Sequence, residues 1–341
     1  MDKEIRSITM SHGSGGDATS SLIEEIFKGE LGNEYLDRME DSAVVPGGER
    51  LALTTDSFVV KPPVFDGGNI GRLAVCGTVN DILTSGAVPK YLTAGFVLEE
   101  GLSLELLKTV VRSMAETARE AGVIIVSGDT KVIEHAAGKD EGSSLIINTA
   151  GVGILKEGVD IGPRKLEKGD KIILSGNLGE HEAAILKERL NIKNDLIKSD
   201  NAPLKEMVMG LMDSGLKVHA IRDVTRGGLA TVLNEFASSS GRNILISEEK
   251  LPVSGPVRDF AGLLGLDPLY MGNEGKMVFA VGSDDAEEAL RIIRNSKYGE
   301  NAAVIGTVLD EDSQPTLAVE TLIGGKRIAG PLYGEGLPRL C

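Results

Sequence analysis

The chain has 341 residues, with 36 Lys and Arg against 51 Asp and Glu, and a formal net charge of -15 at pH 7. This charge, together with an aromatic content of 4% and no Trp, argues against a nucleic-acid backbone as partner and against a platform for stacked bases. A hydrophobic content of 41% over this length is enough for two domains that each bury a core.

The first residues are charged and predict no targeting segment. Residues 1–4 read Met-Asp-Lys-Glu, and no later apolar run has the length of a membrane span. The only cysteines are Cys76 and Cys341, so a disulfide framework is not expected. We therefore expect a cytoplasmic protein that binds neither nucleic acid nor a membrane.

A glycine-rich loop opens the chain and leads into an amphipathic segment at 18–28. The loop consists of His12, Gly13, Ser14, Gly15 and Gly16. Glycines before a helix let free backbone N–H groups approach an anion, although an ordinary flexible turn has the same composition. The loop is neither a Walker A sequence nor a dinucleotide-binding fingerprint.

The following stretch alternates strand-like and helical patterns, which predicts a mixed α/β unit. We expect strands at 51–55, 91–98, 123–127 and 145–155, and helices at 69–85 and 103–121. The first helix is apolar nearly all round and should be buried, yet it contains Asn80 and Asp81. A buried carboxylate needs a metal, a cation or hydrogen-bond donors, so Asp81 either binds a ligand or caps or pairs with another element.

Asp81 belongs to a dispersed set of acids beside strand ends or glycine turns. The set is Asp41, Asp56, Asp81, Asp129 and Asp223. Mg²⁺ is commonly held by a few carboxylates together with substrate phosphates, so the set predicts a metal-nucleotide site. Any one of these acids can instead be a solvated surface residue.

A polar stretch rich in Gly and Lys at 156–170 is the predicted domain boundary. We divide the chain into a Gly-rich segment with its helix at 1–40, a first α/β domain at 41–157, which the resemblance given below implies is the ATP-binding and dimerisation domain, an α/β domain at 158–330 and a tail at 331–341. In the second domain we expect strands at 171–175, 277–281 and 302–308. Helices are expected there at 180–190, 204–213, 229–239 and 285–295.

A second candidate anion site opens the predicted helix at 229–239. The preceding residues Arg222, Asp223, Arg226, Gly227 and Gly228 combine a Gly-Gly turn with two arginines. Free N–H groups at the helix start and guanidinium groups both suit phosphate.

Two short motifs pair a basic with an acidic group. In the first motif, Lys131 follows Asp129 and Thr130. In the second, Glu274 stands between Asn273 and Gly275 and is followed by Lys276. Neither pattern is specific alone, and a solvated salt bridge is the ordinary role for Lys131.

The chain ends in Pro-Arg-Leu-Cys, with Cys341 as the last residue. A terminal thiol behind glycines at 330, 334 and 336 can be presented to another active site. Most terminal residues have no such role.

Taken together, these motifs resemble the HypE family, the carbamoyl dehydratases of nickel-iron hydrogenase maturation. The resemblance covers nearly the whole chain, and the Pro-Arg-x-Cys end is its most specific part. It implies the two-domain α/β fold of aminoimidazole ribonucleotide synthetases, an N-terminal domain that pairs with a second subunit through its strands, and a flexible tail. It also implies a homodimer and two further partners, the carbamoyltransferase HypF and the HypC-HypD complex.

The implied reaction is dehydration of an S-carboxamide on Cys341 to a thiocyanate, with ATP and Mg²⁺. Lys131 and Glu274 are the candidates for proton transfer, and His12 is added as a catalytic candidate. The implied ATP-binding residues are Gly13, Ser14, Gly15, Gly16, Asp56, Asn80, Asp81, Thr130, Arg226, Gly227 and Gly228. Selenophosphate synthesis is the alternative within the superfamily, although no cysteine precedes Cys76. A non-catalytic nucleotide-binding scaffold is the alternative outside it.

Overall fold

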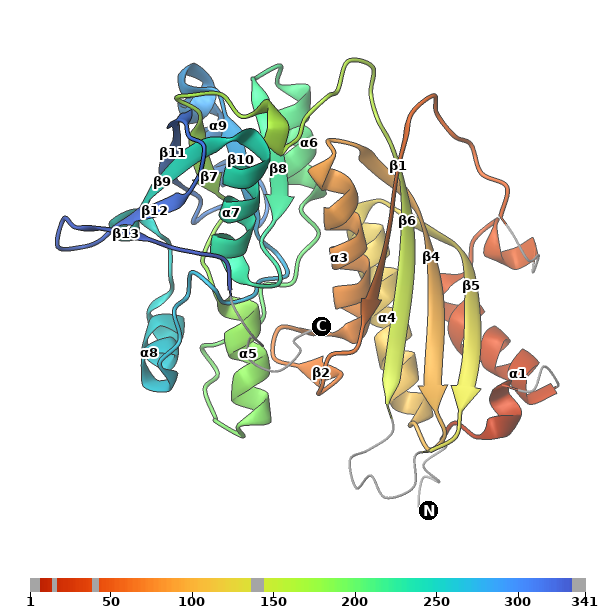
Figure 1. The fold of residues 1–341 in the computed structure, drawn as a ribbon. Helices are drawn as coiled ribbons and strands as arrows, with labels where there is room; N and C mark the ends of the chain where they lie inside the picture. Colours follow the sequence, from red (N-terminus) through yellow and green to blue (C-terminus); the bar gives the residue numbers. More distant parts are fainter. Residues whose placement is uncertain (1–6, 14–16, 39–42, 136–143, 333–341) are drawn as a thin grey trace.

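The computed structural model describes residues 7–13, 17–38, 43–135 and 144–332. The chain forms two α/β domains, each built on its own sheet, with helix α3 (Ile70–Thr84) between them (Figure 1). No helix of the described ranges is both long and apolar enough to cross a membrane.

The N-terminal domain contains a four-stranded sheet with the order β1-β6-β4-β5. Its strands are β1 (Leu51–Phe58), β4 (Val88–Glu99), β5 (Ile124–Ile133) and β6 (Leu145–Ile154). β6 pairs antiparallel with both β1 and β4, whereas β4 and β5 run parallel. Helix α3 and helix α4 (Leu104–Ala121) cover one face of this sheet (Figure 1).

Smaller elements complete this domain. They are the hairpin β2 (Val64–Phe65) and β3 (Gly68–Asn69), the helices α1 (Asp17–Leu22) and α2 (Gly29–Leu31), the π-helical turn η2 (Ile23–Lys28), and the 3-10 turns η1 (Met10–Gly13) and η3 (Leu36–Arg38). The expected helix at 18–28 is thus split into α-helical and π-helical halves.

Helix α3 begins at a side-chain cap and is buried on nearly every face. The Asn69 carboxamide oxygen accepts hydrogen bonds from the backbone N–H groups of Gly71 and Arg72, which satisfies donors that a helix start leaves free. The lack of polar residues along most of α3 explains its position between two domains. Gly71 permits a close crossing, because a Cβ there would lie 2.3 Å from the Val110 carbonyl oxygen of α4.

The C-terminal domain contains a seven-stranded sheet with the order β13-β12-β9-β11-β7-β10-β8. Its strands are β7 (Lys171–Leu174), β8 (Val218–Asp223), β9 (Arg242–Ser247), β10 (Met277–Val281), β11 (Ala303–Glu311), β12 (Leu317–Glu320) and β13 (Lys326–Ile328). All neighbouring pairs are antiparallel except β9 and β12. Strand β8 forms the edge of this sheet on the side of α3 (Figure 1).

The helices of this domain cover its sheet or extend below it (Figure 1). They are α5 (Glu180–Arg189), α6 (Lys205–Asp213), α7 (Gly228–Ser240), α8 (Gly255–Leu264) and α9 (Ala286–Asn295), with the 3-10 turns η4 (Pro163–Lys165), η5 (Glu248–Lys250) and η6 (Ser283–Asp285). The expected elements are confirmed to within a few residues. The sequence interpretation missed α8 and the strands β8, β9, β12 and β13, which are short or carry polar residues.

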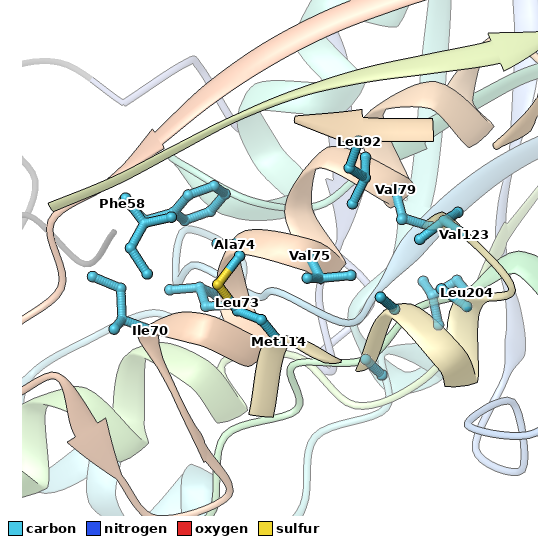
Figure 2. Close-up of a cluster of buried hydrophobic side chains, with 14 of the residues drawn as sticks. Phe58, Ile70, Leu73, Ala74, Val75, Val79, Leu92, Met114, Val123 and Leu204 are labelled. Atoms are coloured by element: carbon cyan, nitrogen blue, oxygen red, sulfur yellow. The ribbon is translucent and has the colours of Figure 1, made fainter. Parts of the chain in front are cut away.

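One hydrophobic cluster continues from the first domain into the second. It contains Leu73 and Val79 of α3, Met207 of α6 and Phe279 of β10. Figure 2 shows part of this cluster, with Leu204 beside the N-terminal domain's Val123 and Val79. The two sheets are therefore joined through packed side chains as well as through the chain.

Candidate active site

Four carboxylates from four elements meet where α3 contacts the C-terminal domain. Asp56 lies on β1, Asp81 on α3, Asp223 at the end of β8 and Glu274 in the loop before β10. The pKa of Asp81 is raised to about 6, mainly by burial and also by the charges of Asp223 and Asp56. These side chains thus lie close enough to influence one another's charge, as the sequence predicted for Asp56, Asp81 and Asp223.

Glu274 is the most strongly affected member of this acidic cluster. Burial raises its pKa well above the ordinary value, and the charges of Asp200, Asp223, Asp56 and Asp81 act in the same direction. This environment favours the protonated carboxyl group, and a cation bound nearby would favour the carboxylate.

Asp56 and Asp81 also have local hydrogen-bond donors. The Thr54 hydroxyl of β1 donates to Asp81 at 3.0 Å, and the backbone N–H of Ser57 donates to Asp56 at 2.8 Å. Burial raises the pKa of Asp56, while the nearby Arg226 guanidinium lowers it. Of the two arginines in the predicted phosphate turn, Arg226 is therefore the one whose charge lowers the pKa of Asp56.

The loop carrying Glu274 is held in place by a second buried carboxylate, Asp200. One oxygen of Asp200 accepts the backbone N–H of Glu274 at 3.0 Å, and the other lies 3.0 Å from the Lys276 ammonium. Lys276 also pairs with Glu180 at 3.3 Å. Burial alone would lower the pKa of Lys276, but these two carboxylates raise it, so Lys276 stays charged.

Asn80 connects α3 to the chain on the other side of the cluster. Its side-chain amide donates to the Ala202 carbonyl at 2.9 Å and accepts the Leu204 N–H at 3.0 Å. The sequence interpretation placed Asn80 against a nucleotide, whereas here its amide is committed to backbone groups. Asn80 therefore fixes the segment that contains Asp200.

The predicted Gly-Gly turn is present between β8 and α7. Gly227 and Gly228 have φ values of 73° and 62°, and a Cβ on Gly228 would lie 2.6 Å from the Leu269 carbonyl oxygen. Helix α7 begins at Gly228, directly after the Asp223 strand end. Arg222 pairs with Glu235 at 2.7 Å, and its charge also lowers the pKa of Asp81 and of Asp223.

A second group of predicted site residues lies at the far edge of the N-terminal sheet. Gly13, Asp129, Thr130 and Lys131 line a cavity of about 370 Å³ beneath the N-terminal helices. Lys131 pairs with Asp129 at 3.1 Å, and both are largely exposed. The expected tight turn at Asp129 is wrong, because the residue lies within β5.

His12 makes only local hydrogen bonds in this structure. Its Nδ1 atom lies 3.0 Å from the Thr9 N–H and 2.9 Å from the Thr9 hydroxyl. The contacts are those of a short turn, and its catalytic role stays a prediction.

The two groups do not form one site within a single chain. Asp56 pairs with Thr149 of β6, which pairs with Ala94 of β4, which pairs with Gly128 of β5. Three strand spacings separate Asp56 from the Asp129 region by about 14 Å. Asp129 also shares its row with Ser57, and adjacent residues on a strand face opposite sides.

The described ranges contain no group of three His, Cys, Asp or Glu side chains arranged tightly enough to hold a metal ion. Asp41, Ser14, Gly15, Gly16 and Cys341 lie outside the described residues. The acidic cluster nevertheless offers carboxylates to a cation, because Asp56 and Asp223 raise the pKa of Asp81 and all three raise that of Glu274.

Sequence reasoning gave no role to Asp200, Lys276, Glu180 or Thr54. Lys276 follows Glu274 in the motif at 273–276, so the motif already contained the basic residue that could have been considered. Asp200 and Glu180 are distant in the chain and carry no local pattern that distinguishes them from other acids.

The comparisons with known proteins identify the family of this chain. Two family models match, described as AIR synthase related protein, N-terminal domain at residues 39–155 and C-terminal domain at residues 167–316. The carbamoyl dehydratase HypE of Escherichia coli K12 is 44% identical over 99% of this chain and 100% of its own length. This chain belongs to the HypE family of carbamoyl dehydratases.

Solved structures of the family have the same fold. A hydrogenase maturation protein HypE in complex with ATP superposes with a TM-score of 0.92 at 41% identity, covering 97% of this chain and 99% of that one. A HypE chain from a HypE-HypF complex gives a TM-score of 0.78 at 45% identity, covering 92% and 100%. The predicted family and two-domain α/β fold are therefore confirmed.

Proposed function

We propose that this protein uses ATP to dehydrate an S-carboxamide on Cys341 to a thiocyanate, which supplies cyanide for the iron of nickel-iron hydrogenases. The observation that carries the proposal is the buried cluster of Asp56, Asp81, Asp223 and Glu274, in a chain similar over its full length to carbamoyl dehydratases. Carboxylates gathered in this way can hold the metal ion of a bound metal-nucleotide.

The reaction explains why ATP is needed. The carbonyl oxygen of a carboxamide is a poor leaving group, so a phosphoryl group is transferred to it from ATP. The C–O bond then breaks, the oxygen leaves as phosphate, and the nitrogen loses both protons to give the C≡N triple bond. The sulfur stays attached to carbon throughout, so Cys341 keeps the product.

The acidic cluster is the proposed magnesium site. Asp56, Asp81 and Asp223 would hold Mg²⁺, and Asp41 and Asp129 are the further candidates from the sequence. Bound there, Mg²⁺ would neutralise charge on the transferring phosphoryl group. Arg226 and the N–H groups at Gly227 and Gly228 would contact phosphate oxygens.

Glu274 and Lys131 are the proposed proton-transfer residues. Burial and the neighbouring carboxylates raise the pKa of Glu274, which favours its protonated form. It can therefore donate to the departing oxygen and accept a proton from the amide nitrogen afterwards. Lys131 would take the second proton, and His12 is a further candidate for this role.

We further propose that a second copy of this chain completes the site. Lys131 and Glu274 are on opposite sides of one sheet in a single chain, whereas a partner's β5 edge can approach the open face. That side of the domain exposes large aliphatic side chains on β1 and β5, namely Leu51, Leu53, Ile124 and Ile133. Covering them in a homodimer would be favourable. Gly13 and Thr130 would then border the nucleotide.

The relatives support the remaining assignments. A family member was solved in complex with HypF, so we propose that a HypF-type carbamoyltransferase loads Cys341 here. A HypC-HypD-type complex would accept the cyanide. A cytoplasmic location would keep the Cys341 thiol reduced for loading.

Intact-mass measurement tests the proposed function. The protein should gain one carboxamide on incubation with the carbamoyl-donor system and should lose one water when Mg-ATP is added. Cys341→Ala should prevent the gain, and Glu274→Gln should bind ATP but keep the carboxamide. A wild-type protein that is loaded and binds ATP without losing water would be a scaffold, which contradicts the proposal.

A further inference from the structure

The hairpin formed by β12 and β13 exposes an unusual number of aliphatic side chains. Ile323 is 95% exposed, Leu322 is 72% exposed and Ile328 is 71% exposed. The hairpin projects from the C-terminal domain on the side away from the N-terminal sheet (Figure 1). These side chains therefore do not lie on the open sheet face assigned above to a second copy.

The hairpin is held in a defined shape although its apolar residues face outward. The Thr321 N–H donates to the Gly325 carbonyl at 2.7 Å across the turn, where Gly324 has a φ of 79°. Arg327 pairs with Asp267 at 3.0 Å. Among the described residues, strand β13 is the last strand of its sheet, so one side of it offers backbone groups that no described strand pairs with.

The chain passes directly from this hairpin toward Cys341. Ala329 is buried and donates its N–H to the Leu317 carbonyl at 2.9 Å, and the Tyr270 hydroxyl donates to the Gly330 carbonyl at 3.0 Å. The anchored part of the chain thus reaches Gly330. Cys341 is the ninth residue after the exposed Leu332, and this segment spans at most about 30 Å.

We infer that Leu322, Ile323 and Ile328 of the hairpin, here called the hairpin surface, dock the protein that places the carboxamide on Cys341. The inference rests on the proposed function, because only then must Cys341 enter a second protein's active site. That active site has to lie within about 30 Å of Leu332. The hairpin surface is the exposed apolar surface that directly precedes this segment in the chain, and a strand edge beside it allows β-strand addition.

The occupant is therefore a carbamoyl-transferring protein with an apolar patch and an accessible strand or loop. A second copy of this chain is a poorer occupant, because the hairpin and the open face of the N-terminal sheet lie at opposite sides of the molecule (Figure 1). The cyanide acceptor must also reach Cys341, and the experiment separates the two partners.

The test compares the double variant Leu322→Asp with Ile323→Asp against Leu196→Asp, whose side chain is also exposed but lies outside the hairpin. Affinity for a HypF-type carbamoyltransferase is measured by calorimetry, and loading of Cys341 by mass spectrometry. The double variant should bind at least about tenfold more weakly, as expected when central apolar contacts are lost, and should load more slowly. Leu196→Asp should bind and load like the wild type.

Chemical loading separates this inference from the proposed function. Cyanate adds a carboxamide to a thiol without any partner protein. After this treatment the double variant should lose water with Mg-ATP as fast as the wild type. If the treated wild type also keeps its carboxamide, the proposed function fails and docking is judged from affinity alone.

Three results would overturn the inference: unchanged affinity in the double variant, equal loss in Leu196→Asp, or loss of binding only to the cyanide acceptor. Ile328→Lys, at the strand edge away from the turn, is the second variant if the first alters the thermal unfolding midpoint. It should weaken transferase binding in the same direction.

Discussion

Asp81 combines burial with the repulsion of neighbouring carboxylates, and this has a consequence for stability. Its pKa rises from 3.8 to about 6 on folding, so between these values the folded protein binds more protons than the unfolded chain. Stability is then greatest below the lower value and falls as the pH rises through the upper one. Asp223, Asp56 and Glu274 have raised pKa values and act in the same direction.

We expect Asp81→Asn to raise the unfolding midpoint of the nucleotide-free protein at pH 7 and to flatten its fall between pH 4 and pH 6. The same variant should lose Mg-ATP binding. Thermal unfolding across this pH range and nucleotide titration check both outcomes, with Glu157→Gln as a control at an exposed acid. Unchanged nucleotide affinity in Asp81→Asn would remove this residue from the proposed site.

At the scale of single elements, a glycine of α3 determines how closely this helix approaches α4. A Cβ at position 71 would lie 2.3 Å from the Val110 carbonyl oxygen and 2.9 Å from Met114, and neither the α4 backbone nor the packed core can yield freely. Gly71→Ala should therefore destabilise the protein by about 1–3 kcal/mol through overpacking.

The matched control is Gly262 in α8, where a Cβ would meet no atom within 4 Å. Gly262→Ala should stabilise the protein by up to about 1 kcal/mol, because alanine favours the helix. Urea unfolding followed by circular dichroism measures both changes. Equal effects of the two substitutions would show that helix propensity, and not the α3–α4 contact, determines the result at Gly71.

The sequence predicted α3 well because its apolar residues occur on every side, and this also predicted that Asn80 and Asp81 would be enclosed. The position of Asp129 was not predictable in the same way. In the sheet, strand β6 lies between β1 and β4. Asp56 on β1 and Asp129 on β5 are therefore far apart across the sheet. Strand β8 was missed because His219, Arg222 and Asp223 interrupt its apolar alternation at a sheet edge.

At the scale of the whole molecule, the proposed homodimer rests on the placement of Lys131 and Glu274 on opposite sides of the N-terminal sheet. Leu53 on the open side of β1 is 72% exposed, and a charge there would be costly in an apolar interface. Leu53→Asp should shift the protein from a dimer to a monomer in light scattering and should abolish ATP-dependent water loss.

Leu263→Asp, at a similarly exposed leucine of α8, should leave both the mass in solution and the activity unchanged. A wild-type protein that is monomeric and active at assay concentration would show that Lys131 acts within its own chain or has no role in the reaction.

The hydrophobic cluster that runs through α3 has a consequence for how the protein can be divided. Leu73 and Val79 are packed together with Met207 and Phe279, so either half alone would expose an apolar surface that the other half normally covers. The boundary predicted near residue 157 therefore runs through a hydrophobic cluster that both halves share. We expect two fragments divided there to associate with each other in order to bury this surface again.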